Sequence, residues 1–164
     1  MGQAMPAPRK KKVPKKAAVK GRRPNKSGDF REDAVRSRAF AKAILRAQPY
    51  TLSPERLEKL LREASRTAGR LPKPPFQESW AYLHTMLRLL RAFQLGEYRA
   101  VPPKALLSIV AAVAYLVDPN DFIPDEVPFL GFLDDATIIE FAARKTRSTL
   151  DEFMAWEVRR LLKK

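Results

Sequence analysis

The sequence lacks cysteine and contains a single histidine, His84. The absence of cysteine excludes disulfides, thiol nucleophiles and cysteine-ligated zinc, although it leaves the redox compartment open. One histidine cannot supply the two or three ligands of a histidine zinc site. No nucleophile motif accompanies His84, so we predict a place at the edge of the core rather than a role as a general base. Glycine is also scarce, and the six residues are scattered, which excludes a glycine-rich phosphate loop.

The sequence has no long hydrophobic run. The uncharged stretch 105–117 has 13 residues, or about 20 Å of helix, whereas the bilayer core is about 30 Å thick. A second stretch, 127–143, contains Asp134, Asp135 and Glu140, and an acid at the bilayer centre costs about 2.5–3.5 kcal/mol. The basic N-terminal region has no apolar segment of the roughly 7–15 residues that a secretory signal needs. We therefore expect neither a spanning helix nor secretion.

Acidic residues are absent from residues 1–27, although the chain has 18 of them and a net charge of +14. The same segment carries four prolines and almost nothing large and apolar. We predict that residues 1–28 form a disordered polybasic tail and that residues 29–164 form a single helical domain. Two roles fit the tail: a solvated appendage, or an arm that binds the phosphates of anionic lipid or nucleic acid. The basic residues of such an arm are Arg9, Lys10, Lys11, Lys12, Lys15, Lys16, Lys20, Arg22, Arg23 and Lys26.

The rest of the sequence has helical periodicity and no alternating strand pattern. Ser53 before Pro54 marks one helix start, Gly69 marks the end of the same helix, and Pro49 is expected to end the helix before it. The pattern predicts an all-α bundle of about five helices, at 29–47, 54–68, 77–95, 103–117 and from 134 or 135 to about 162, the last of which allows a break near 147–150. The apolar face of this last helix is predicted at Ile138, Ile139, Ala142, Leu150, Phe153 and Leu161.

Residues 103–145 read as an apolar helical hairpin with an acidic connection. Residues 105–117 carry no charge, and a helix that is apolar on all sides must be buried on all sides. We therefore place this helix at the centre of the bundle. The alternative is a re-entrant membrane hairpin, because Lys104 precedes the hairpin while Arg144, Lys145 and Arg147 follow it. Its short length and its internal charges favour the buried form.

Five aspartates gather around the connection of the hairpin: Asp118, Asp121, Asp125, Asp134 and Asp135. Oxygen-rich clusters suit Mg²⁺, Ca²⁺ or Mn²⁺, so one interpretation is a divalent cation site. The other is structural: aspartate near a turn bonds its own backbone, Asp134 or Asp135 caps the next helix, and nearby arginines neutralise the rest. The arginines considered are Arg88, Arg91 and Arg144. The spacing fits no EF-hand loop, so we favour the structural interpretation and expect no other cofactor.

The stretch 115–135 resembles the signature of the YkvA family, a small bacterial domain of unknown function. The matching residues are Tyr115, Pro119, Asp121, Ile123, Pro124, Asp125, Pro128, Gly131, Asp134 and Asp135. The resemblance covers about 105–145, a quarter of the chain, and its motif is long and unusual. Asp118 stands where the family typically has serine, and Asn120 stands where an apolar residue is common, so the connection is more polar here. Members are usually described as predicted membrane proteins, and the resemblance implies no established activity, substrate or cofactor.

Three functions remain open. The first is a non-enzymatic helical module, associated with the cytoplasmic face of a membrane through the hairpin and the polybasic tail, because stable anchoring requires two signals. The second is a soluble protein whose tail binds nucleic acid without reading its sequence. The third is a metal-dependent protein that uses the acidic connection, and it is the weakest because no general base pairs with the cluster. We favour the first, with an anionic membrane surface as the partner.

Overall fold

The computed structural model describes residues 26–71, 79–118 and 132–163. Within these ranges the chain is helical and contains no strand, which confirms the all-α prediction. The helices are α1 (Lys26–Leu52), α2 (Pro54–Ala68), α4 (Trp80–Gln94), α5 (Pro103–Val117), α7 (Phe132–Lys145) and α8 (Arg147–Leu161). The predicted disorder of the tail falls on residues 1–25, which lie outside the described residues.

Helix α1 is longer at both ends than the sequence predicted. It begins at Lys26, inside the segment assigned to the tail, and it continues to Leu52 with Pro49 inside its last turns. The prediction that Pro49 ends the helix is therefore wrong. Proline removes one backbone donor and crowds the preceding turn, but the C-terminal half of α1 packs against the bundle, where α1 contacts α5 and Phe40, Ala43 and Ala47 are all buried. This packing outweighs the local cost of a proline near the end of the helix.

Helix α2 forms as its sequence predicts. Ser53 is the cap, and its hydroxyl oxygen accepts a hydrogen bond from the backbone N–H of Arg56 at 3.3 Å. The predicted apolar stripe is the buried face: Leu57, Leu60, Leu61, Ala64 and Ala68. Gly69 follows the helix with φ of −65°, so it stays right-handed. Gly96, after α4, adopts φ of 77°, a left-handed conformation that side chains disfavour.

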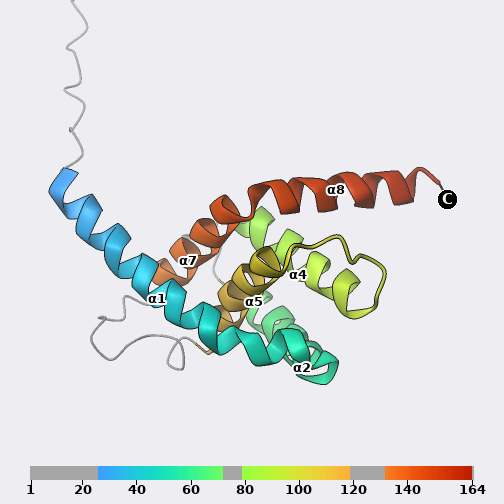
Figure 1. Ribbon diagram of the computed structural model, residues 1–164, viewed down its shortest axis with the longest axis horizontal. Coiled ribbons are helices and arrows are strands. Elements are labelled where there is room, and N and C mark those ends of the chain that lie inside the picture. The colour runs from blue at the N-terminus through green and yellow to red at the C-terminus, as the bar shows by residue number, and fades with distance from the viewer. Residues whose placement is uncertain (1–25, 72–78, 119–131, 164) are drawn as a thin grey trace, which may run out of the picture.

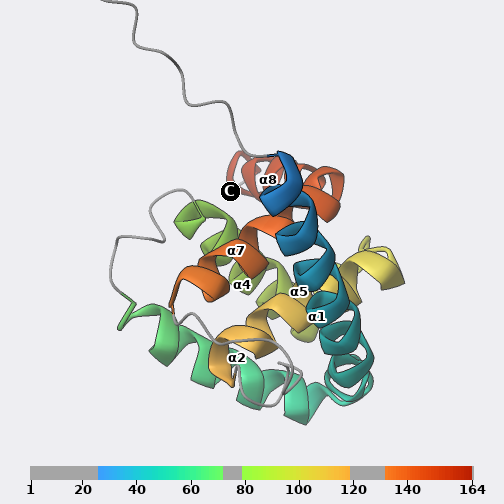
Figure 2. The ribbon, with the colours of Figure 1, turned by 90° about the vertical axis from the view of Figure 1, so that its left-hand side faces the viewer.

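Helix α5 occupies the centre of the bundle, with the bounds that the sequence predicted. Every residue from Ser108 to Leu116 is buried. The helix packs against α1, α2, α4 and α7, and the two ribbon views show α5 enclosed by these neighbours (Figures 1 and 2). An uncharged helix is stable in this position because other helices cover each of its sides.

The predicted last helix is divided in two at Thr146. Helix α7 ends at Lys145 and α8 begins at Arg147, so the break precedes the predicted one by one residue. Thr146 is buried, has φ of −114°, and its hydroxyl donates to the carbonyl of Ala142 at 2.8 Å. Because the chain changes direction here, α8 leaves the line of α7, packs on α4 and runs outward along one side of the bundle (Figure 1).

Candidate functional site

The two helices of the hairpin form the core of the bundle. In α5 the side chains of Ile109, Val110 and Val113 are fully buried, and in α7 those of Ile139 and Ala142 are fully buried as well. Helices α5 and α7 pack on each other, and α1 covers α5 (Figure 2). The apolar surface of these two helices is therefore engaged in protein packing. This is the buried form of the hairpin, which the sequence favoured over a re-entrant one.

The five aspartates proposed as cation ligands are only partly within the described residues. Asp118 is exposed at the C-terminal end of α5, and Asp135 is buried in α7. Asp121 and Asp125, together with the side chain of Asp134, lie outside the described residues. Among the residues that the structure describes, no three or more histidine, cysteine or acidic side chains form a group that could hold a metal. The cation site stays a prediction.

His84 lies at the edge of the core, as the sequence predicted. It is half-buried, and its ring packs beside Trp80 with centroids 4.7 Å apart. Arg88, on the same helix, was a candidate partner for the acidic connection of the hairpin. Among the described residues it forms two hydrogen bonds with the carboxylate of Glu157 on α8, at 2.9 and 3.1 Å, whereas most of the connection lies outside those residues.

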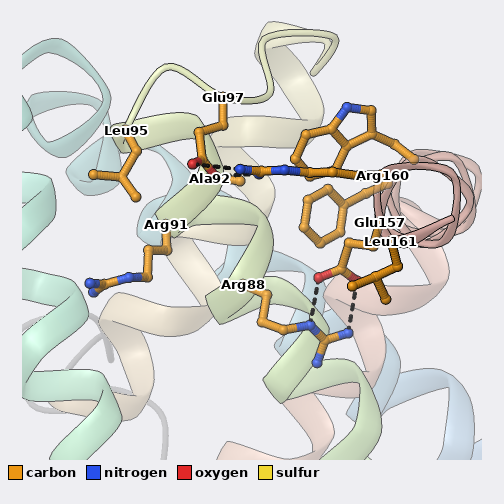
Figure 3. Close-up of a pocket in the computed structure, with 10 residues that line it drawn as sticks. Arg88, Arg91, Ala92, Leu95, Glu97, Glu157, Arg160 and Leu161 are labelled. Carbon is orange, nitrogen blue, oxygen red and sulfur yellow. Dashed lines mark hydrogen bonds and ion pairs between the residues drawn. The ribbon is translucent and has the colours of Figure 1, made fainter. Parts of the chain in front are cut away.

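A groove of about 320 Å³ lies between α4 and α8. Two ion pairs bridge it: Arg88 with Glu157, and Arg160 with Glu97 at 2.6 and 2.9 Å (Figure 3). Both arginines bind their carboxylates through two nitrogens, which is the geometry that gives such pairs direction as well as strength. The hydrogen bond and charge of Glu97 raise the pKa of Arg160 above its ordinary value. These pairs fasten α8 to the body of the protein.

An aromatic cluster forms the floor beneath this groove. Tyr98 packs against Phe153 and Trp156, with ring centroids 5.2 and 5.1 Å apart, and Phe153 stacks on Trp156 at 5.6 Å. Burial raises the pKa of the Tyr98 hydroxyl, and the nearby charge of Glu152 raises it further, while Arg159 opposes the shift. The floor therefore anchors the middle of α8, whereas its last turns extend past the cluster.

The last turns of α8 carry exposed apolar and basic side chains together. We call Val158, Arg159, Leu161, Leu162 and Lys163 the α8 edge. Val158 is 55% exposed, Leu161 71% and Leu162 81%. Neither Arg159 nor Lys163 forms an ion pair with any residue that the structure describes. The edge thus presents uncovered leucines and free cations side by side.

The sequence prediction for Leu161 is wrong. Its spacing from Leu150 and Phe153 predicted a buried position, but Leu161 is exposed while the other two are buried. Helix α8 runs outward from the bundle toward its C-terminal end (Figure 1), and within the described residues Leu161 stays 71% exposed there. Sequence reasoning missed the α8 edge because the stripe was assigned to the core. The signal available was the composition of residues 158–164, which contain four basic residues and no acid.

The fold defines an all-α protein built around a buried apolar hairpin, and that hairpin is the segment matched in other proteins. The family described as "Protein of unknown function (DUF1232)" matches residues 105–141, from the first turns of α5 to α7. The protein of Bacillus subtilis (strain 168) described as "Uncharacterized membrane protein YkvA" is 32% identical over 77 residues, which cover 47% of this chain and 73% of that protein. The chain belongs to the YkvA family. No solved structure matches it.

The relative is described as a membrane protein, and a helix that crosses a bilayer must be both long and apolar. Among the residues that the structure describes, none of the helices combines the length and the hydropathy required to cross a membrane. Helix α5, the most apolar, has 15 residues, whereas a span takes about 20.

Proposed function

We propose that the protein is a non-enzymatic helical module that attaches to the anionic cytoplasmic surface of a membrane. The observation that carries the proposal is the α8 edge, where exposed leucines lie on the same turns as cations that form no ion pair within the described residues. Interfacial helices bind by this combination: the apolar side chains enter the boundary between head groups and acyl chains, and the cations contact anionic lipids. The membrane-protein description of the Bacillus relative supports the same direction.

The free energies expected for each side chain favour attachment through several weak contributions that act together. Burying a leucine or valine side chain contributes about 1.5–3 kcal/mol, and the three apolar residues of the α8 edge are already more than half exposed. Each lysine or arginine near an anionic leaflet adds about 1 kcal/mol. Arg159 and Lys163 at the edge therefore act with the basic residues of the N-terminal segment. Neither signal alone gives stable anchoring, but two together do.

The hairpin has a narrower part in the proposal than the sequence suggested. Helices α5 and α7 are enclosed by the rest of the bundle, so they reach a bilayer only if the bundle opens. A direct contribution of the hairpin would come from its connection, residues 119–131, which lie outside the described residues. In the proposal, the two helices provide the rigid core that holds α4 and thereby orients α8.

The test is co-sedimentation with vesicles that contain either neutral phosphatidylcholine alone or an added anionic lipid, phosphatidylglycerol. The intact chain should sediment with the anionic vesicles and be released by high salt, since the Debye length shortens from about 10 Å to about 3 Å between 0.1 and 1 M. Replacing Leu161 and Leu162 by serine should weaken binding by about tenfold or more, because the removed side chains contribute more than 1.4 kcal/mol.

The matched control replaces Leu45 and Leu52 by serine. These leucines are 73% and 76% exposed on α1, so they equal the edge leucines in chemistry and exposure but not in position. The variant that carries both serines should bind the anionic vesicles as strongly as the intact chain does. Deleting residues 1–25 leaves α1 whole, because the helix begins at Lys26, and it should weaken binding to anionic vesicles only. Equal binding to neutral and anionic vesicles, or equal losses in both leucine pairs, would contradict the proposal.

A further inference from the structure

A second groove lies between α1, α5 and α7, on helices other than those that form the α8 edge. Its walls are apolar and come from Phe40 and Ile44 on α1, Leu107 on α5 and Phe141 on α7. Phe40 and Phe141 meet edge to face, with centroids 5.1 Å apart. The volume of about 300 Å³ is at the small end of the range of ligand pockets, about 300–1,000 Å³. The groove is therefore large enough for a short acyl chain.

Two lysines line the same groove. Lys104 lies in the first turn of α5 and Lys145 in the last turn of α7, so they stand at opposite ends of the hairpin sequence. The packing of α5 on α7 brings them to one groove. The Lys145 ammonium lies 5.0 Å from the centre of the Phe141 ring. Neither lysine forms an ion pair within the described ranges, and no carboxylate lines the groove there.

We propose that this groove binds an amphiphile with a single acyl chain and an anionic head, such as a fatty-acid anion. The two ammonium groups would hold the head, and the four apolar walls would hold the chain. The two halves of the groove together match an amphiphile better than a simpler occupant. A free inorganic anion would leave the aromatic and aliphatic walls in water, and a neutral lipid would leave both cations without a partner. The site requires no bilayer, so it is independent of the proposed membrane attachment.

The first experiment is titration calorimetry on the full chain with three soluble probes. Decanoate has both the chain and the anionic head, acetate has the head alone, and decyltrimethylammonium has the chain with a cationic head. Decanoate should bind with one site per chain, while acetate and the cationic amphiphile should show no saturable binding. Acetate binding as tight as that of decanoate, or equal binding of both amphiphiles, would overturn the proposal.

The second experiment tests the two halves of the groove by substitution. The variant Lys104→Gln with Lys145→Gln should bind decanoate about tenfold more weakly, equivalent to about 1.4 kcal/mol. Its control, Lys42→Gln with Lys59→Gln, removes the same charge from exposed positions outside the groove and should bind as the parent does. Equal weakening in both pairs would mean that net charge alone matters, and the site would be refuted.

The chain-binding half is tested by filling the groove. Ala41 is exposed and lines the groove, so tryptophan at this position is compatible with folding while it blocks the space. Ala41→Trp should abolish decanoate binding, and Ala81→Trp, on an exposed position of α4, should not. Circular dichroism of each variant establishes that it is folded. Unchanged decanoate binding by folded Ala41→Trp would overturn the proposal.

The calorimetry uses no membrane. Decanoate binding can therefore be observed even if the chain does not bind vesicles, and vesicle binding can be observed even if decanoate does not bind. Each experiment thus refutes only its own proposal.

Discussion

Helices α5 and α8 have the same length, 15 residues each, but they occupy opposite environments. In α5, ten residues are buried and the only charged residue is Lys104 in the first turn. In α8, three residues are buried, Thr149, Leu150 and Phe153, and charged residues fill much of the remainder. The family match covers most of α5 and does not reach α8. One helix therefore lies within the segment that the family model matches, and the other lies beyond it.

The two helices are also held by different forces. Burial of apolar area holds α5, and this contribution scales with the surface removed from water, at about 25 cal/mol per Å². An aromatic cluster and two bidentate ion pairs hold α8. Exposed ion pairs contribute little, about 0.2–1 kcal/mol each, and they weaken in salt. The difference predicts a strongly held centre and a more easily detached α8.

The largest expected effect comes from making the same substitution in both helices. Leu116→Ala in α5, at a side chain 3% exposed, should lower the free energy of unfolding by about 2–5 kcal/mol, because it leaves a cavity. Leu161→Ala in α8, at a side chain 71% exposed, should change it by no more than about 0.5 kcal/mol. Urea unfolding followed by circular dichroism measures both. Similar losses at the two positions would mean that the end of α8 is covered in solution.

An intermediate effect is expected from the ion pairs that fasten α8. A double-mutant cycle on Arg160 and Glu97, each replaced by alanine, should give a small favourable coupling energy that falls at high salt. The matched control is the cycle on Arg62 and Glu58, an exposed pair within α2, which should give about 0.3–0.5 kcal/mol. A coupling of zero at low salt would show that the pair of Arg160 and Glu97 does not help to hold α8.

The smallest effect, and the most local, concerns the pH dependence of the α8 anchor. Because the folded state raises the pKa of Tyr98 above its ordinary value of about 10, folding favours the neutral hydroxyl. That contribution is complete below about pH 10 and is lost as the pH rises through the higher folded pKa. The free energy of unfolding should therefore fall above about pH 10, and the free energy of unfolding of the Tyr98→Phe variant should fall less steeply. Parallel profiles for the two proteins would show that Tyr98 is not responsible.

Local patterns predicted several elements correctly. Helix α2 was recognised from Ser53 and Pro54, and α5 from an uncharged run with proline at its start, because caps and composition act within a few residues. Pro49 was misread because packing of α1 on α5 outweighs the loss of one backbone hydrogen bond. Leu161 was misread for the opposite reason: its periodicity was right, but no neighbour within the described residues covers it. The remaining candidate residues, in the tail and in the connection of the hairpin, are outside the described residues and stay predictions.

The sequence by itself determined the helical class, the ends of α2 and α5, the exclusion of disulfide and histidine-zinc chemistry, and membership of the YkvA family. These depend on residue types and short spacings, which are properties of the chain. Only the tertiary structure decided that the hairpin helices are enclosed, that the described residues leave the α8 edge exposed, and that Lys104 and Lys145 share one groove. Periodicity identifies the apolar face of a helix, but whether that face is buried depends on which distant segment packs against it.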